Sequence, residues 1–443
     1  MAVCSKIVRS ALGLVALAGC ASVAGCSTSD GATPNEPGQQ GPDEEGDAAD
    51  GAGDAADEGD PKPTQRIDAA QPSGPSSPRD GGPARELDAK TSRTSDARTD
   101  PSEGPTEGPA RDAGSALPDA SEPVVERPPG DCPRELVGWA SVAGDGVSST
   151  TGGGNATPVR PKSAAELMTY ASDATPRVIE ITGTLRVPSL QIASNKTLVG
   201  IGNDATLEGG LRIRGRKDEP VSNVIIRNLR IDGATTEVDN DAVQLYFAHH
   251  VWIDHSEIWD GPDGDLDMSH AVNWVTVSWT KVRYSENYKK PPGETNDHRF
   301  ASLVGHSDNN AGEDTGRLKI SFHHNWWAER VIERMPRVRF GQVHVFNNYF
   351  ASPGNNYCVR AGRGASVLVE SNFFARVNSP HEFNSAEDEA TAHITARDNV
   401  YEATTGTQAI GGGGTPFTSV PYDPKLDAPA SLPSLVKGCA GPR

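Results

Sequence analysis

Residues 323–350, HHNWWAERVIERMPRVRFGQVHVFNNYF, contain the pattern that decides the fold. An apolar run at 320–322 leads into this stretch, and a second run at 343–345 starts 23 residues later. Each run is followed by an asparagine and two aromatic residues, as Asn325-Trp326-Trp327 and Asn348-Tyr349-Phe350. Short runs of this kind predict β-strands. We therefore expect a structural unit that repeats about every 23 residues.

Two arginines, Arg334 and Arg339, lie between these runs on either side of Pro336. A loop held by a rigid scaffold is where functional residues concentrate, and a planar guanidinium group suits the recognition of carboxylates. The alternative is that both side chains are solvated or paired with structural carboxylates.

The same spacing extends through the carboxyl-terminal two thirds of the chain. Starts of the apolar runs are separated by 27, 24, 45, 23, 24 and 27 residues, and no amphipathic helix fits between successive runs. The interval of 45 leaves room for an extra coil near 300–304. The runs begin at Val224, Val251, Val275, Ile320, Val343, Val367 and Ile394.

Asparagines recur at one position of the last four repeats, and aromatic residues follow them. Stacked coils of a parallel β-helix place equivalent positions about 4.8 Å apart, so inward asparagines can form a ladder and aromatic rings can stack. A helix from Ser163 and a strand at 177–181 would cap the open end of the core. The sequence therefore predicts an all-β protein, a single-stranded parallel β-helix with a short N-terminal capping helix. The asparagines are Asn325, Asn348, Asn372 and Asn399.

The chain has 443 residues and a formal net charge of −19. Residues 31–130 carry 22 acidic and 9 basic side chains and almost no aromatic residues, so they account for −13 of that charge. Such a composition cannot bury enough apolar surface to fold, and we predict a disordered acidic linker over 27–131 ahead of a folded domain at 132–443. The absence of a clustered basic face excludes nucleic acid as the predicted partner.

Residues 1–26 have the pattern of a signal peptide, with Lys6 and Arg9 before an apolar run at 11–18 that is too short to span a membrane. Two overlapping sites end at Cys20 and Cys26 and resemble a bacterial lipobox, which predicts a lipid anchor and an outer-membrane location. The alternative is an ordinary secretory signal.

Three cysteines follow the signal region, namely Cys132, Cys358 and Cys439. In an exported protein Cys132 and Cys439 could form a bridge that closes the whole folded region, which would leave Cys358 buried and unpaired. No spacing typical of a zinc site occurs.

Acidic residues gather before two of the repeats. Asp239 and Asp241 are two positions apart and share one face of an extended chain, and Asp263, Asp265 and Asp267 repeat this pattern one coil later. Carboxylates so placed repel one another unless a cation lies among them, and an all-oxygen site suits Ca²⁺. The alternative is a set of surface carboxylates or turn caps.

From about Gly138 to Tyr401 the chain resembles the pectate lyases of the extracellular pectate lyase superfamily, polysaccharide lyase family 1. The resemblance rests on SNKTLVGIG at 194–202, the run at 223–231, VWIDH at 251–255 and RMPRVR at 334–339, which fits the family's arginine, any, proline, any, any, arginine signature. It implies a right-handed parallel β-helix that cleaves de-esterified polygalacturonate by Ca²⁺-dependent β-elimination to unsaturated oligogalacturonides.

The resemblance also implies roles for individual residues. Asp241, Asp263 and Asp267 match the primary calcium ligands, and Asp239 joins them when substrate brings further ions. Arg334 matches the base that takes the C5 proton, and Arg339 matches a partner of the substrate carboxylate. An arginine can act as a base only if its protonated form is disfavoured, which predicts an alkaline optimum.

One position departs from the family pattern. Many members carry a substrate-binding lysine five residues before the glycine of the next coil, and this chain has Phe300 before Gly305. Arg299 or Lys289 could supply the missing positive charge. If the site binds carboxylates more weakly, partly methyl-esterified pectin could also be a substrate.

Other functions stay open on the sequence alone. A pectin lyase or a polygalacturonase-like hydrolase could use the same scaffold, the hydrolase with paired carboxylates and no metal. A non-catalytic polysaccharide-binding β-helix could bind calcium for stability only. We interpret His255, after Asp254, as part of a buried hydrogen-bond network, and we expect a monomer.

Overall fold

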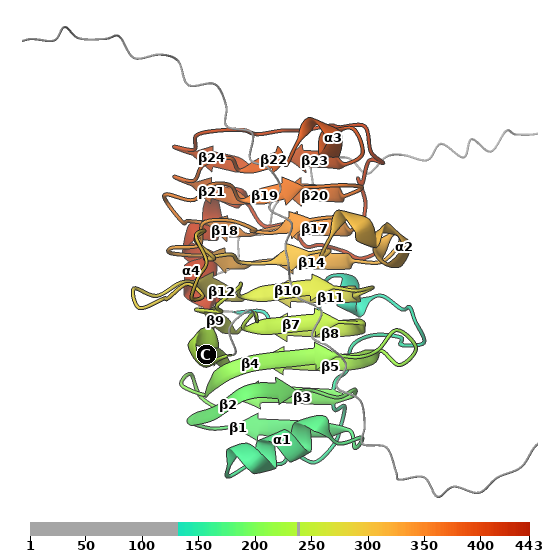
Figure 1. Cartoon of the computed structure of the whole chain (residues 1–443), viewed down its shortest axis with the longest axis vertical. Coiled ribbons are helices and arrows are strands. Elements are labelled where there is room, and N and C mark those ends of the chain that lie inside the picture. Colours follow the sequence, from blue (N-terminus) through green and yellow to red (C-terminus); the bar gives the residue numbers. More distant parts are fainter. Residues whose placement is uncertain (1–131, 237–239) are drawn as a thin grey trace, which may run out of the picture. The chain divides into compact units, whose positions relative to one another are not determined.

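The computed structural model describes residues 132–236 and 240–443, which form a parallel β-helix of about nine coils (Figure 1). The predicted signal peptide with Cys20 and Cys26, the predicted linker and the predicted calcium ligand Asp239 lie outside the described residues.

Each coil contributes one strand to a nine-stranded sheet whose neighbouring strands are all parallel. We call it the nine-strand sheet. In spatial order its strands are β1 Arg177–Ile181, β3 Lys196–Gly200, β5 Val221–Arg227, β8 Ala248–Asp254, β11 Asn273–Ser278, β14 Lys319–His323, β17 Gln342–Phe346, β20 Ser366–Glu370 and β23 His393–Arg397.

The second sheet has fifteen strands and divides at β4, Thr206–Arg214, into two arms, with β2, Thr184–Gln191, paired to β4. The cleft arm continues through β7 Val243–Tyr246, β10 Leu266–Ser269, β13 Leu303–Val304, β16 Arg337–Val338, β19 Val359–Ala361 and β22 His381–Phe383. The aromatic arm continues through β6 Arg230–Asp232, β9 Glu257–Trp259, β12 Lys281–Arg283, β15 Trp326–Trp327, β18 Tyr349–Phe350, β21 Phe373–Ala375 and β24 Val400–Glu402.

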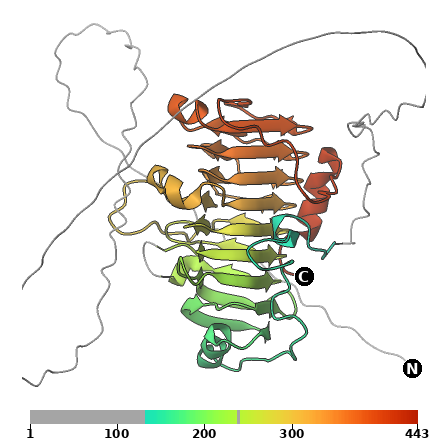
Figure 2. The ribbon, with the colours of Figure 1, turned by 90° about the vertical axis from the view of Figure 1, so that its right-hand side faces the viewer.

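Helices are short and lie at the ends or on the outside of the coils (Figures 1 and 2). The predicted cap is present as α1, Ala164–Ser172, whose N-cap Ser163 accepts a hydrogen bond from the Glu166 amide. Leu167 and Ala171 on this helix are fully buried in the core, as a cap requires. The other helices are α2 Ala311–Asp314, α3 Ala386–Glu389 and α4 Leu432–Cys439, with 3₁₀ turns η1 Trp139–Ser141, η2 Gly233–Thr235, η3 Asp308–Asn310 and η4 Pro429–Ser431.

The repeat predicted from the sequence is confirmed residue by residue. The seven predicted run starts, from Val224 to Ile394, are direct register partners across the nine-strand sheet. The predicted extra coil near 300–304 is wrong, because β11 pairs directly with β14. The 45-residue interval is instead one coil with long loops, and Leu303–Val304 is its strand in the cleft arm.

The asparagine ladder and the aromatic stacks are also as predicted. The Asn348 side-chain oxygen accepts from the main-chain and side-chain amides of Asn325 at 2.9 and 3.1 Å, and Asn372 accepts in the same way from Asn348. Ring centroids of Phe350 and Phe374 are 4.3 Å apart in a parallel stack. The inner turn of each coil is therefore tied to the next by paired hydrogen bonds.

We expect Asn348→Ala to lower the free energy of unfolding by about 2–4 kcal/mol, because it leaves both Asn325 donors buried without their acceptor. Urea unfolding measures the effect. Asn399→Ala, at the half-buried end of the ladder, is the matched control, since water can replace its side chain. Equal losses in the two variants would contradict the role assigned to the ladder.

The first and last described segments lie on the outside of the coils and are joined by a disulfide between Cys132 and Cys439. The amides of Trp139 and Ala140 in η1 donate to Ser321 Oγ and Thr276 Oγ1 on the nine-strand sheet. Helix α4 packs its apolar side on Trp279, Tyr349 and Phe373. Cys358 is buried and has a free thiol.

Candidate active site

The predicted site residues come from successive coils of the cleft arm. Asp241 lies two residues before β7, Asp267 lies within β10, and Arg334 precedes β16. Parallel pairing puts Gln244 beside Asp267, and Leu303 of the next coil beside Arg337. Because neighbouring strands are about 4.8 Å apart, this pairing brings side chains nearly 100 residues apart in the sequence onto one surface.

Asp241 and Asp267 form the buried part of the site, with 3% and 8% of their surface exposed. Asp267 Oδ1 accepts from the Leu303 amide at 2.9 Å, and Asp241 Oδ2 accepts from Gln244 Nε2 at 3.1 Å. Asp241 Oδ1 is buried and has no hydrogen-bond partner among the described residues. Burial, together with repulsion from Asp267 and Asp263, raises the pKa of Asp241 well above its usual value.

A glycine lets these two carboxylates lie close to the main chain. A Cβ atom at Gly264 would lie 2.9 Å from Asp241 Oδ1 and 3.5 Å from Asp267 Oδ1. An unpaired buried oxygen, a second carboxylate and a missing side chain together fit a hard divalent cation such as Ca²⁺.

Asp263 lies at the edge of this group, because His298 engages it. Asp263 Oδ1 is 2.8 Å from His298 Nδ1, and 43% of the Asp263 side chain is exposed. Within 132–236 and 240–443, no three His, Cys, Asp or Glu side chains are arranged to hold a metal ion. The structure thus brings Asp241 and Asp267 together and directs Asp263 toward His298.

Arg334 faces these carboxylates. Burial alone would lower the pKa of Arg334, but Asp267 and Asp263 outweigh it and raise that pKa above its ordinary value. Arg334 Nε is buried without a hydrogen-bond partner among the described residues, and its Cζ lies 4.0 Å from the Phe300 ring centroid. The guanidinium is therefore held between an aromatic ring and an acidic cluster.

The main chain at Arg334 adopts an unusual conformation. Its φ is +62°, a left-handed value that is costly for a side chain other than glycine. The Arg334 carbonyl accepts from the Ser302 amide at 2.6 Å, and the next amide, of Met335, donates to the Cys358 carbonyl at 2.8 Å. Neighbouring coils thus fix the residue on both sides.

The three cations predicted to bind substrate differ in how far the protein already neutralises them. Arg339 is buried and its Nε donates to Asp308 Oδ1 at 2.7 Å. Arg299 pairs with Asp297 in its own loop at 2.6 Å. Lys289 lies exposed on the loop that precedes Arg299.

Sequence reasoning missed Arg337. Burial, followed by repulsion from Arg339 and Arg334, lowers its pKa, and its Nε is buried without a partner among the described residues. Its register partner Arg360 is neutralised by Glu382 at 2.7 Å and stacks on Tyr357. Side chains alternate between the two faces of an extended chain, and Arg337 lies two residues before Arg339. This alternation could have identified Arg337 as sharing a face with Arg339.

Comparisons with known proteins show which family this chain resembles. Residues 133–409 match a family model described as pectate lyase. Probable pectate lyase A of Aspergillus fumigatus is 34% identical over 288 residues, which cover 63% of this chain and 80% of that protein. Pectate lyase A of Aspergillus niger is 33% identical over 314 residues, or 69% of this chain and 86% of that protein.

A solved structure of a pectate lyase from Bacillus sp. N165, in complex with trigalacturonate, has a similar fold. The two chains are 24% identical with a TM-score of 0.56, and the match covers 70% of this chain and 99% of that one. Across the residues that the structure describes, we find no helix long and apolar enough to cross a membrane.

Proposed function

The chain belongs to the pectate lyase family and is a polysaccharide lyase, and we propose that it cleaves α-1,4-linked polygalacturonate by Ca²⁺-dependent β-elimination to unsaturated oligogalacturonides. The observation that carries this proposal is the approach of Arg334 to Asp267 and Asp263 on one surface of successive coils, close enough for their charges to act on its guanidinium. Relatives named pectate lyases, one of them with trigalacturonate bound, support the choice of substrate.

Asp241 and Asp267 would hold the cation, with Asp263 joining if it leaves His298, and Asp239 is a further candidate outside the described residues. Asp241 Oδ1 is free to accept it, since this oxygen has no hydrogen-bond partner among the described residues. When bound, Ca²⁺ would offset the charge of the uronate carboxylate and so acidify the C5 proton.

Arg334 is the proposed base. It takes the proton from C5, the electron pair of the C5–H bond forms the C4–C5 double bond, and the C4–O bond breaks as the departing oxygen gains a proton from solvent. Arg334 and Arg337 repel each other's positive charge, which favours a neutral guanidine once the nearby carboxylates are offset. The buried Nε without a partner is consistent with a group that awaits a ligand.

Arg337 is our preferred partner for a substrate carboxylate. Arg299 and Arg339 each have a carboxylate of the protein within 2.7 Å, whereas no ion pair of Arg337 occurs within the described part of the chain. A partly buried guanidinium without a counter-ion gains most from an incoming carboxylate. Arg339 would orient the cleft through Asp308, and Arg299 and Lys289 would contribute at its edge.

A narrower second possibility, acceptance of partly methyl-esterified pectin, is favoured by Phe300. Its ring covers one face of the Arg334 guanidinium at 4.0 Å, and its surface is 9% exposed. An aromatic ring at this position tolerates an ester where a cation would select a free carboxylate.

The reaction can be identified from its product. With polygalacturonate and Ca²⁺ we expect a steady rise in the ultraviolet absorbance of the unsaturated product, a loss of that rise on adding a chelator, and its return when Ca²⁺ is restored in excess. New reducing ends without the absorbance would indicate hydrolysis instead. Turnover unaffected by the chelator would refute the metal dependence alone.

We further propose export through the signal at 1–26, a lipid anchor at Cys20 or Cys26, a linker over 27–131 and a monomeric domain at 132–443. The acidic composition of residues 31–130 supports the linker.

A further inference from the structure

A cavity of about 240 Å³ lies away from the acidic cluster, where the nine-strand sheet turns into the aromatic arm. The end of β3 and the following turn line one wall, Arg227 and Asn228 at the end of β5 line another, and His255 after β8 lines a third. Arg134 and Arg443 complete the lining. The carboxylates of the proposed lyase site belong to the next turn of each coil, beyond the strands of the aromatic arm.

Three guanidinium groups therefore surround one small space. Arg227 Nε donates to Asp254 Oδ2 at 3.0 Å and its Cζ lies 4.2 Å from the Trp252 ring centroid, but Arg227 Nη2 is buried with no hydrogen-bond partner among the described residues. A buried donor in that state costs free energy unless a ligand or water accepts its proton.

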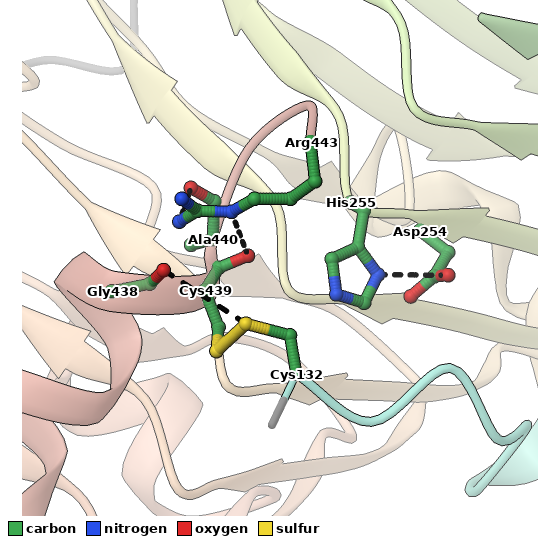
Figure 3. The surroundings of a disulfide bond; sticks show 7 residues. All are labelled: Cys132, Asp254, His255, Gly438, Cys439, Ala440 and Arg443. Carbon is green, nitrogen blue, oxygen red and sulfur yellow. Dashed lines mark hydrogen bonds and ion pairs between the residues drawn. A yellow bond between two sulfur atoms is a disulfide. The ribbon is translucent and has the colours of Figure 1, made fainter. Parts of the chain in front are cut away.

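Arg134 and Arg443 come from opposite ends of the described domain. The main-chain amide of Arg443 donates to Asn228 Oδ1 at 2.6 Å, whereas its guanidinium donates only long hydrogen bonds, at 3.3 and 3.4 Å, to the carbonyls of Cys439 and Ala440. Arg134 is exposed and forms no ion pair within the part of the chain that the structure describes. The disulfide joins their two segments, since Cys132 is two residues before Arg134 and Cys439 is four before Arg443. Figure 3 shows this disulfide together with Arg443.

His255 adds polar atoms to the wall. The ring is buried, and neither nitrogen has a hydrogen-bond partner among the described residues, although Nδ1 lies 3.0 Å from Asp254 Oδ2. The expected hydrogen-bond network around His255 is thus only partly formed. The ring lies beside Asp254 and close to Arg443 and the disulfide (Figure 3).

We propose that this cavity is a binding site for a small oxyanion, held by Arg227, Arg134 and Arg443. Asp254 is the one side-chain carboxylate that forms an ion pair with these three groups in the described chain, and even with the main-chain carboxylate of Arg443 counted, the three guanidinium groups leave the space a net positive charge. A cation is excluded by that excess, and an apolar ligand would leave the buried Arg227 Nη2 unsatisfied. Inorganic phosphate and the carboxylate of a single uronic acid share the required chemistry.

Calorimetric titration of the full, disulfide-bonded chain at constant ionic strength tests the site, with inorganic phosphate in one arm and free galacturonate in the other. We expect one of the two to bind, and Arg134→Gln/Arg443→Gln to weaken that binding by about tenfold or more. The ligand whose binding is lost in this variant identifies the source of the oxyanion. Polygalacturonate turnover is expected to stay unchanged, because neither arginine belongs to the lyase site.

Arg216→Gln/Arg376→Gln, which removes two exposed arginines outside the cavity, is the matched control and is expected to keep the wild-type affinity. The proposal is overturned if neither ligand binds, or if both double variants lose affinity equally. Arg227→Lys provides a second test, because lysine keeps the positive charge but lacks the buried Nη2 donor. Unchanged affinity in this variant and in Arg134→Gln/Arg443→Gln would likewise overturn the proposal.

Discussion

Arg334→Ala is expected to lower turnover of polygalacturonate by about a thousandfold or more, because it removes the proposed base, the guanidinium whose charge acts on Asp267. The loss should appear in kcat, since the substrate carboxylate would still bind Arg337. Product absorbance under saturating substrate and Ca²⁺ measures it, and a thermal unfolding curve verifies that the variant is folded.

Arg330→Ala is the matched control for this variant. Arg330 lies four residues earlier in the same loop, also has a positive φ, of +68°, and pairs with Glu286 at the surface. Its loss is expected to change turnover by no more than about twofold, as is usual for an exposed ion pair. Retained turnover in Arg334→Ala would assign the base to another residue.

The same residue predicts a pH dependence. The carboxylates raise the pKa of Arg334, and a guanidinium acts as a base only after losing its proton. The reactive fraction therefore grows as pH rises toward that pKa, and kcat should increase across the neutral and alkaline range up to the pH at which the fold fails. A maximum in the acidic range would contradict an arginine base.

The repeat could be predicted from sequence because it depends on side-chain type at regular intervals. Each coil must return one apolar residue to the core, and so Val224, Val251 and Val275 are in register. The asparagines recur because each buried turn needs the same hydrogen bonds. The 45-residue interval misled us, since loop length carries no such constraint.

The functional site was harder to predict, because it depends on which charged side chains pair with one another. Spacing placed Asp263 among the metal ligands, but it does not reveal that His298, 35 residues later, lies 2.8 Å from its carboxylate. In the same way Asp297 neutralises Arg299, which was expected to replace the family lysine that is missing at Phe300. Such pairings depend on loop conformations that follow no period.

The arginine-lined cavity leaves no sequence signature at all. Arg134, Arg227 and Arg443 are separated by most of the described chain, and they meet only because the coils stack and the disulfide joins the outer segments. A sequence pattern shows which residues share a face of one helix or strand, whereas this cavity is lined by five separate segments.

The proposed cation site makes the second large prediction, which concerns Gly264→Ala. The added Cβ would lie 2.9 Å from Asp241 Oδ1 and 3.5 Å from Asp267 Oδ1, and would occupy the space where the cation is expected. Asp241 Oδ1 ends a side chain that can rotate away, so the fold should absorb the change. The carboxylate would then no longer face Asp267.

We expect the Ca²⁺ concentration for half-maximal turnover to rise by about tenfold to a hundredfold in Gly264→Ala, with the unfolding temperature within about 3 °C of wild type. Gly312→Ala is the matched control, because a Cβ there meets no atom within 4 Å. It should leave the Ca²⁺ requirement unchanged. If Gly264→Ala also leaves the Ca²⁺ requirement unchanged, the cation does not bind between Asp241 and Asp267. The turnover of Gly264→Ala in excess Ca²⁺ then distinguishes a displaced metal site from a reaction that needs no metal.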